Sequence, residues 1–262
     1  MNLWNYKGEQ NNITEALQLR IPPHAVISLT GAGGKTSLMT AWARELASQG
    51  RHTVITTTTH LQHPLHFKDQ SESPYRGIPV LFPEDFTKNG SPDTEAAAEK
   101  LEELLAEHGT AMVVSADPAR PEKLMQPATE IMERVFRTAD AVLIEADGSR
   151  RKPFKWPMPW EPVVSDKTDI TVCVAGLSAL GHPMQEAMYG TDLLPEDLRR
   201  DIVDEQLMST VLASPDGGQK GSRGEFRVFL NQADNEALFR SAYRIRQILG
   251  VYGIRSAWGS LI

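Results

Sequence analysis

The sequence predicts an α/β protein whose mainly parallel, twisted sheet is covered by helices on both faces. Short apolar runs alternate along the chain with segments that have the spacing of amphipathic helices. Several of these runs are apolar throughout, as strands covered on both faces tend to be, and others are rich in β-branched residues. Parallel neighbours need crossover connections, so the alternation predicts a series of right-handed β–α–β units.

The individual elements follow from local patterns taken in chain order. The first predicted helix carries Leu38, Trp42 and Leu46 on one face and stops at Gly50. A second helix over 96–108 ends at Gly109, a third carries Ile131 to Val135, and the last runs from Leu238 to Gly250. Strands are expected over 25–30, 52–59, 80–82, 111–114, 141–144, 170–174 and 226–230, with a short last strand near Ile254.

Length and composition limit the possible classes of protein. The 262 residues are compatible with a single domain, since single cores stop growing near ~250–300 residues. We expect an N-terminal extension over 1–20 and one domain over 21–262, with an irregular insertion around 60–94. The net charge of −7 argues against general binding to nucleic acid or to anionic membrane.

The same composition predicts a soluble, reduced and cytoplasmic protein. Cys173 is the only cysteine, which excludes a disulfide framework and a zinc site built on cysteines. No apolar run approaches the ~18–20 residues of a membrane span, and the polar N-terminus lacks the core of a signal peptide.

A glycine-rich loop follows the first predicted strand and precedes the first helix, as a phosphate-binding loop requires. Glycines let backbone N–H groups approach phosphate oxygens, and a helix N-terminus favours an anion. Lys35 would contact terminal phosphates, and the Thr36 hydroxyl would ligate Mg²⁺. Because Leu29 replaces the first glycine of the full Walker A pattern, the motif has the shorter spacing of Mur-ligase-like ATPases. The alternative is a plain strand-to-helix turn with an exposed lysine. The predicted nucleotide-binding residues here are Gly31, Ala32, Gly33, Gly34, Lys35, Thr36 and Ser37.

Two acids end the apolar strand at 141–144. Glu145 and Asp147 are two residues apart, so they project to the same side while the chain stays extended. We expect Glu145 to take part in holding the metal, Asp147 to orient a nucleophile, and the N–H group of Gly148 to meet a terminal phosphate. Taken alone, the same residues would favour the alternative of a polar strand end followed by a turn, and it is the glycine-rich loop that favours a functional role.

A basic segment follows directly, with Trp156 and Trp160 interleaved. Arginine suits bidentate recognition of phosphate or carboxylate, so Arg150, Arg151 and Lys155 are candidates for binding an anionic second substrate. A solvated basic loop is the alternative, and it is equally compatible with the sequence. Glu161 is expected to pair with one of these cations. The cations are Arg150, Arg151, Lys152 and Lys155.

Three weaker signals remain. Thr58 and Thr59 end the second strand on the carboxyl edge of the sheet, where their hydroxyls would reach phosphate or metal. Asn231 and Asp234 resemble the guanine-reading element of GTPases, with Gln232 in place of lysine; the alternative is that Asp234 caps the last helix. The spacing of His60, His63 and His66 suggests a metal site, but Pro64 opposes a shared helical face and favours a solvated loop. His60 alone remains a catalytic candidate.

Together these motifs resemble those of the YqeC family, also called selenium-cofactor biosynthesis or selenium-dependent hydroxylase accessory proteins. The resemblance runs from about Ile21 to the C-terminus and is most distinctive at 143–149, with Pro153 and Lys155 following. It implies a cytoplasmic P-loop protein associated with maturation of selenium-dependent molybdenum hydroxylases. The motifs that carry it are Thr30–Thr36, Thr56–His60, Leu143–Ser149, Glu161–Val163, Val174–Leu177 and Leu230–Asp234.

The leading functional hypothesis is therefore an accessory protein that binds ATP or GTP with Mg²⁺, with Mg²⁺-dependent phosphoryl chemistry expected. Its second substrate would be an anionic compound of the molybdenum-cofactor type, and its protein partner a selenium-dependent molybdenum hydroxylase or another selenium-pathway protein. Two alternatives stay open. One is a nucleotide-switched delivery chaperone without small-molecule turnover, and the other is a Mur-ligase-like ligase or kinase.

Overall fold

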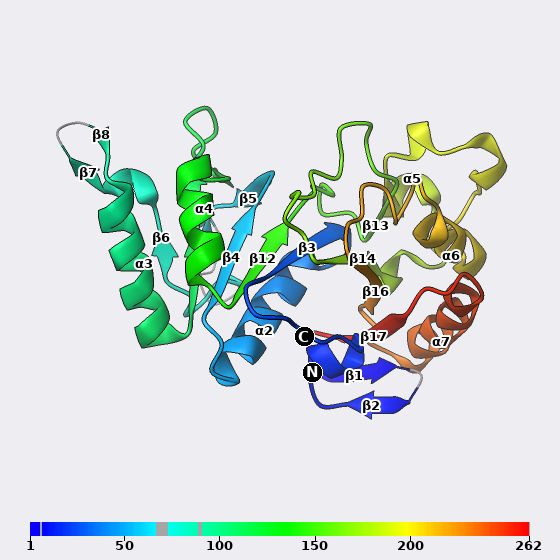
Figure 1. Ribbon diagram of the computed structural model, residues 1–262. Coiled ribbons are helices and arrows are strands. Elements are labelled where there is room, and N and C mark those ends of the chain that lie inside the picture. Colours follow the sequence, from blue (N-terminus) through cyan, green and yellow to red (C-terminus); the bar gives the residue numbers. More distant parts are fainter. Residues whose placement is uncertain (6, 67–72, 89–90, 262) are drawn as a thin grey trace. The chain divides into compact units, whose positions relative to one another are not determined.

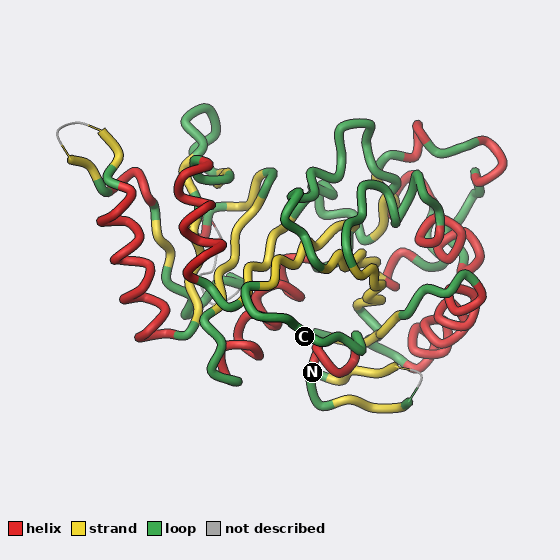
Figure 2. Tube along the Cα trace, viewed as in Figure 1, coloured by secondary structure: helices red, strands yellow, loops and turns green. Residues whose placement is uncertain are grey.

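The computed structural model describes residues 1–5, 7–66, 73–88 and 91–261 (Figure 1). The chain divides into two compact units, each with its own buried apolar cluster. Unit 1 comprises Met1–Arg20, Ser28–Leu38 and Ala146–Ile262, and unit 2 comprises Ile21–Ile27 and Met39–Glu145. Helices and strands alternate along the chain (Figure 2), and the predicted α/β class with mainly parallel strands is confirmed.

Unit 2 is built on parallel strands covered by helices. The strand order is β12 (Ala141–Glu145), β4 (Thr53–Thr57), β9 (Thr110–Val113) and β6 (Val80–Leu81), with each neighbouring pair parallel. On one face, apolar residues from all of these strands pack against α3 (Thr94–His108) and α4 (Thr129–Thr138). Helix α2 (Lys35–Ser48), with Trp42 fully buried, lies on the other side of the strands (Figure 1).

The ends of these helices follow the local sequence. Asp93 caps α3, because its side chain accepts a hydrogen bond from the Ala96 N–H group, and Gly109 ends the helix at a φ of 69°. Gly50 follows α2 with a φ of 79°, as predicted. A left-handed backbone conformation costs glycine little free energy and costs residues with a Cβ atom more.

The insertion predicted at 60–94 contains short elements, and its residues 67–72 and 89–90 lie outside the described part of the chain. Strand β5 extends the chain beyond β4, and β10 does the same beyond β9; both pair with β11 in a small antiparallel sheet. The strand expected at 52–59 therefore ends at Thr57. These smaller elements are β5 (His60–Gln62), η1 (Pro64–His66), η3 (Pro83–Asp85), β7 (Thr87–Lys88), β8 (Ser91–Pro92), β10 (Ser115–Ala116) and β11 (Lys123–Met125).

Unit 1 contains a mixed sheet in the order β2 (Gly8–Gln10), β1 (Asn2–Asn5), β17 (Ser256–Ser260), β16 (Glu225–Asn231) and β14 (Ile170–Gly176). The last three strands are parallel, whereas β1 and β2 are antiparallel to their neighbours. The part of β3 (Ala25–Gly31) that belongs to this unit lies beside β14.

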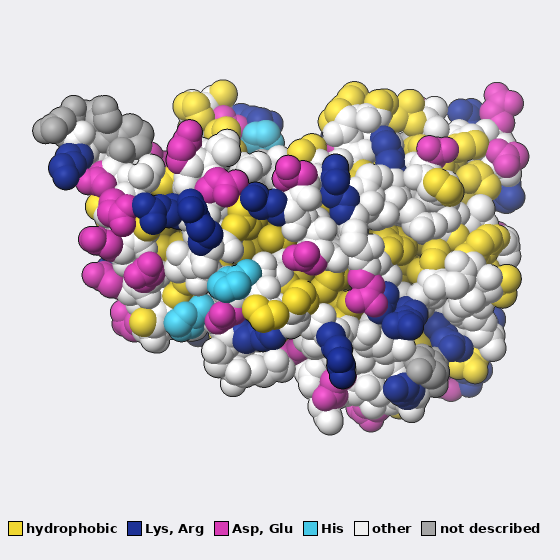
Figure 3. Space-filling view, in the orientation of Figure 1, with side chains coloured by type: hydrophobic (Ala, Val, Ile, Leu, Met, Phe, Trp, Pro, Cys, Tyr) yellow, Lys and Arg dark blue, Asp and Glu magenta, His cyan; other side chains and the backbone are white. Residues whose placement is uncertain are grey.

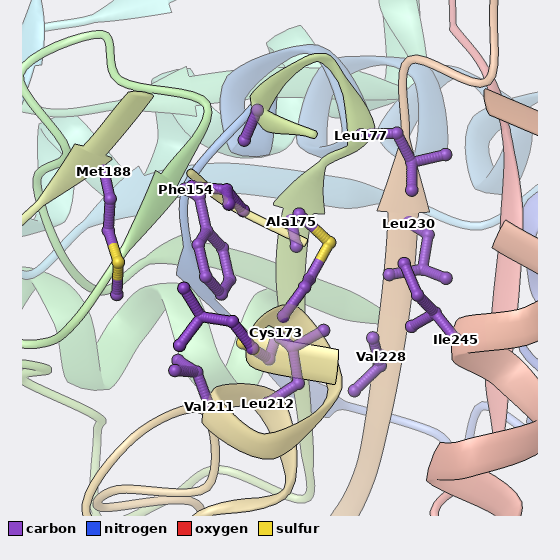
Figure 4. Close-up of a cluster of buried hydrophobic side chains, with 14 of the residues drawn as sticks. Phe154, Cys173, Ala175, Leu177, Met188, Val211, Leu212, Val228, Leu230 and Ile245 are labelled. Atoms are coloured by element: carbon purple, nitrogen blue, oxygen red, sulfur yellow. The ribbon is translucent and has the colours of Figure 1, made fainter. Parts of the chain in front are cut away.

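The core of unit 1 lies between one face of these strands and two helices. Cys173, Val228 and Leu230 point from β14 and β16 toward α6 (Glu205–Ala213) and α7 (Glu236–Val251), as Figure 4 shows. On the opposite face Arg227 is buried, and its Nε donates to the carbonyl oxygen of Leu17, just after α1 (Ile13–Ala16). The remaining elements are β13 (Phe154–Lys155), η4 (Leu177–Ala179), α5 (Met184–Ala187), β15 (Met188–Tyr189), η5 (Thr191–Leu193) and η6 (Glu196–Leu198).

Two local predictions for unit 1 differ from the structure. No strand was predicted before residue 25, yet β1 pairs with β17; its two buried positions, Leu3 and Asn5, form too short a pattern to recognise. The last helix was expected to end at Gly250, but α7 continues to Val251, and the left-handed residue is Gly253 at a φ of 72°. A glycine inside a final helical turn is tolerated when the following residues keep the helical hydrogen bonds.

Among the described residues, no helix combines the length and apolarity needed to cross a membrane. On the face shown in Figure 3, lysine and arginine side chains are interspersed with acidic ones.

Candidate phosphate-binding site

The glycine-rich loop joins the end of β3 to the start of α2, in the context that the sequence predicted. Gly33 and Gly34 adopt φ angles of 81° and 117°. A Cβ atom on Gly33 would lie 2.3 Å from the backbone nitrogen of Gly176, and one on Gly34 would lie 2.2 Å from Nδ2 of Asn231. Both backbone conformations favour glycine, and at Gly33 the neighbouring backbone atoms also leave no room for a side chain.

Two hydrogen bonds fix this loop within unit 1. The Ala32 N–H group donates to the Val174 carbonyl oxygen at 2.8 Å. Nδ2 of Asn231 donates to the Gly33 carbonyl oxygen at 2.9 Å, which orients the amide so that Oδ1 is the remaining acceptor. Among the described residues, this buried Oδ1 atom has no hydrogen-bond partner, so its capacity to accept a hydrogen bond is unused by the protein.

Lys35 turns back over its own loop. Its Nζ donates to the Gly31 carbonyl oxygen at 2.6 Å and lies 3.1 Å from Oδ1 of Asp147. The other carboxylate oxygen of Asp147 accepts a hydrogen bond from the Gly31 N–H group at 3.0 Å. Asp147 therefore holds both the beginning of the loop and its lysine.

Lys155 and Glu161 extend this arrangement into an ion cluster of Lys35, Asp147, Lys155 and Glu161. Nζ of Lys155 lies 3.1 Å from Oδ2 of Asp147 and 2.7 Å from Oε2 of Glu161, and it donates to the Gly148 carbonyl oxygen at 2.5 Å. Glu161 also accepts from the Gly148 N–H group at 3.2 Å. The pairing predicted for Glu161 is confirmed, and the four charges balance within a buried environment.

The structure separates the members of the basic segment. Lys155 was predicted to bind a substrate. It is instead buried in the ion cluster, because it lies on β13 in the interior of unit 1. Lys152 donates to the carbonyl oxygens of Gln185 and Glu186. Arg150 is exposed, with its guanidinium 5.3 Å from the ring centroid of Tyr189. A basic pattern in sequence does not distinguish these three environments.

Arg150 and Arg151 both have left-handed backbone, with φ angles of 48° and 62°. Such conformations are uncommon for non-glycine residues and are maintained by surrounding contacts. The carbonyl oxygen of Pro153 supplies one contact, since it accepts from the Gly176 N–H group at 2.8 Å and lies against Gly33. The two arginines are therefore carried on a segment that adjoins the glycine loop.

Glu145, Thr58 and Thr59 lie together in unit 2. The Glu145 carbonyl oxygen accepts from Oγ1 of Thr57 at 2.9 Å and from the Thr58 N–H group at 3.1 Å. The Thr59 N–H group donates to the same Thr57 hydroxyl at 2.9 Å. Thr57 was not singled out from the sequence, where the four threonines are alike, although its hydroxyl organises this strand end. Metal binding by Thr36 and Glu145 stays a prediction.

The segment after β16 departs from the expected pattern at one position. Helix α7 is capped by Asn235, whose side chain accepts from the Leu238 N–H group, so the alternative that Asp234 caps this helix is wrong by one residue. Asp234 instead accepts from the Ser260 hydroxyl at 2.6 Å. Gln232, at a φ of 66°, accepts from the Ser178 hydroxyl.

The three histidines at 60–66 lie in different surroundings. His60 lies 3.3 Å from Asp117, His63 stacks on Phe82 with ring centroids 5.8 Å apart, and His66 belongs to η1. In the described ranges, no three histidine, cysteine, aspartate or glutamate side chains are grouped so that they could hold a metal ion.

Cys173 is buried on β14 beside this site, as its mid-strand position predicted. Burial raises the pKa of its thiol to about 12, with the charge of Asp147 acting in the same direction. Because the thiolate is the reactive form, we expect a disulfide reagent at pH 7.5 to label the native protein about a thousandfold more slowly than free cysteine. Labelling in denaturant should be fast and reach one thiol per chain. Rapid labelling of the folded protein at this pH would contradict the buried position.

The structure defines an α/β protein with mainly parallel strands and a glycine-rich loop between β3 and α2. The sequence profile of the family described as "YqeC protein" matches residues 27–190, and the chain belongs to this family. It is 32% identical over 164 residues to "Uncharacterized protein YqeC" of Escherichia coli K12, an alignment that covers 60% of this chain and 53% of that protein. The chain thus matches about half the length of this relative.

Two solved structures resemble the fold at low sequence identity. The MinD cell division protein of Aquifex aeolicus aligns with a TM-score of 0.41 and 15% identity, over 86% of this chain and 78% of the other. The MinC:MinD cell division protein complex of the same organism aligns with a TM-score of 0.43 and 13% identity, over 88% and 79%.

Proposed function

We propose that this protein binds ATP or GTP together with Mg²⁺ at the glycine loop. The observation that carries the proposal is the arrangement of that loop between β3 and α2, with a buried lysine at the start of the helix. The first N–H groups of a helix have no partner within the helix, so they favour a phosphate. The buried acceptor atom Oδ1 of Asn231, which lies beside the loop, supports a ligand held close to the backbone.

Within this proposal each residue has a distinct role. Lys35 would give up its contacts with the Gly31 carbonyl oxygen and Asp147 to contact the terminal phosphates, and Thr36 would hold the metal. Asp147, once separated from Lys35, would keep Lys155 and the Gly31 N–H group as partners and would orient a nucleophile. The nucleotide supplies the phosphoryl group, and Mg²⁺ offsets its charge.

We also propose that the protein acts in the maturation of selenium-dependent molybdenum hydroxylases. This role is supported by the motifs shared with the family and by Arg150 and Arg151, which stand on the segment beside the glycine loop and suit an anionic second substrate. A cofactor compound carrying phosphate has that chemistry. The nucleotide would then act on, or in the presence of, this second ligand.

Titration of Mg-ATP and Mg-GTP against the wild type and Lys35→Ala tests the nucleotide site. Loss of a charge-assisted contact worth about 1.5–3 kcal/mol should weaken binding by about 10- to 100-fold. Lys100→Ala is the matched control, because Lys100 is an exposed lysine that pairs with Glu103 at 2.8 Å. Thermal melting of all three proteins checks that they fold. If Lys35→Ala is unstable, Lys35→Arg is tested in its place, because it keeps the positive charge and changes the shape of the group that contacts phosphate. Equal, weak binding by the wild type and Lys35→Ala would overturn the proposal.

A further inference from the structure

A second polar cluster lies in unit 2, formed by His60, Asp117, Arg120 and Lys123 and called here the His60 cluster. His60 begins β5, Asp117 follows β10, and Lys123 begins β11. Because β5 and β10 extend the chain beyond β4 and β9, the cluster lies past the carboxyl ends of two parallel strands. Ligands of open α/β sheets bind at this edge.

Asp117 organises the His60 cluster. Its carboxylate is 7% exposed and accepts from the Ala119 N–H group at 2.9 Å and from Nε of Arg120 at 2.8 Å. The hydrogen bond from Ala119, together with that from Arg120, lowers the pKa of Asp117, so the group is ionised at neutral pH. A buried carboxylate therefore fixes the position of the arginine and lies 3.3 Å from Nε2 of His60.

His60 is held as a neutral ring. Nη2 of Arg120 lies 2.6 Å from Nε2 of His60, and since arginine can only donate, the ring accepts at this nitrogen. Burial lowers the pKa of His60, the charges of Arg120 and Lys123 lower it further, and Asp117 opposes them. The cluster thus contains two permanent cations and one carboxylate, an excess of positive charge in an acidic chain.

The cluster is also open to a ligand. The side chain of His60 is 38% exposed and that of Arg120 is 50% exposed. Among the described residues, Arg120 uses its Nε and Nη2 groups, which leaves further N–H donors of the guanidinium for another acceptor. A fixed, partly exposed arginine with a second cation beside it is suited to an oxyanion.

We propose that the His60 cluster binds an oxyanion, a phosphate or carboxylate group of a ligand, through Arg120 and Lys123 with His60 beside them. The site goes beyond the proposed nucleotide function, because it is formed within unit 2 and requires neither the glycine loop nor Lys35. An anion on Arg120 would offset the positive charges that act on His60. Binding should therefore raise the pKa of this histidine.

The experiment follows the imidazole resonances of the full chain by NMR while inorganic phosphate or acetate replaces chloride at constant ionic strength. His60→Gln assigns the resonance. We expect one of the two anions to raise the pKa of His60 in a saturable manner, and the arm that responds identifies phosphate or carboxylate as the ligand group. Repeating the titration with Lys35→Ala should give the same result, which separates this site from the nucleotide site.

Arg120→Gln and Arg240→Gln provide the matched comparison. Arg240 is an exposed arginine that pairs with Glu236 on α7, so its removal should leave the response unchanged. Arg120→Gln should weaken anion binding by about tenfold or more. Circular dichroism checks that both variants fold. If Arg120→Gln does not fold, Lys123→Gln provides a second test of anion binding. A response no larger than that to chloride, or an equal response after loss of Arg120, would overturn the proposal.

Discussion

Gly33→Ala is expected to lower the free energy of unfolding by roughly 2–5 kcal/mol and to abolish the proposed nucleotide binding. Left-handed backbone costs a residue with a Cβ about 1–2 kcal/mol, and forcing extra atoms into a packed site costs a further 1–3 kcal/mol. The new Cβ would lie 2.3 Å from the nitrogen of Gly176 and 2.5 Å from the Pro153 carbonyl oxygen. Both are backbone atoms, so no side-chain rotation relieves the contact. Urea unfolding and nucleotide titration measure the two effects.

Gly50→Ala is the control for backbone strain alone. Gly50 has a φ of 79°, nearly that of Gly33, but a Cβ there would meet nothing within 4 Å. We expect this variant to lose about 1–2 kcal/mol of unfolding free energy and to leave the proposed nucleotide binding unchanged. The difference between the two variants measures the crowding around the glycine loop. Similar losses in both would show that the loop has room to relax.

Lys155→Met is expected to destabilise the protein by about 3–5 kcal/mol, because it leaves Asp147 and Glu161 without the cation that they share. For a chain of this size the melting temperature should fall by about 10 °C. Calorimetry at neutral pH measures this change. Methionine keeps much of the side-chain volume, so the loss reports chiefly the unpaired charges.

Lys152→Met removes a lysine three residues away whose ammonium group donates to the carbonyl oxygens of Gln185 and Glu186. Its effect should stay within about 1 kcal/mol. Lys155→Met combined with Glu161→Leu should recover part of the stability, since it removes one of the stranded carboxylates. Equal destabilisation by the two lysine substitutions would mean that the ion cluster contributes little to folding.

Much of the fold could be predicted from the sequence because its signals are local. Apolar runs such as 141–144, and a helix capped between Asp93 and Gly109, are visible within a few residues. Strand β1 could not be predicted, because it is stabilised by pairing with β17 near the other end of the chain. The end of the last helix was predicted at the wrong glycine. Gly250 and Gly253 both look like helix-ending residues in the sequence, and only the structure shows that Gly253 has the left-handed backbone.

The glycine loop and the pairing of Glu161 followed from motifs, whereas the environment of each cation did not. Lys155 and Lys152 look alike in the sequence, but one is buried and the other contacts surface carbonyls. Tyr189, whose ring lies beneath the Arg150 guanidinium, carries no motif that marks it. The partners of Asn231 also depend on strands brought together by the sheet, which local patterns do not reveal.

If the protein binds a nucleotide as proposed, the balance of charge in the ion cluster would link phosphate binding to cation binding. In the resting arrangement two ammonium groups face two carboxylates. A phosphate that draws Lys35 away leaves both carboxylates facing Lys155 alone, and this excess of negative charge favours the arrival of a cation. By reciprocity, a cation that binds there first loosens Lys35 and increases the affinity for phosphate by the same factor. The cluster would thus favour the metal–nucleotide complex over either component alone.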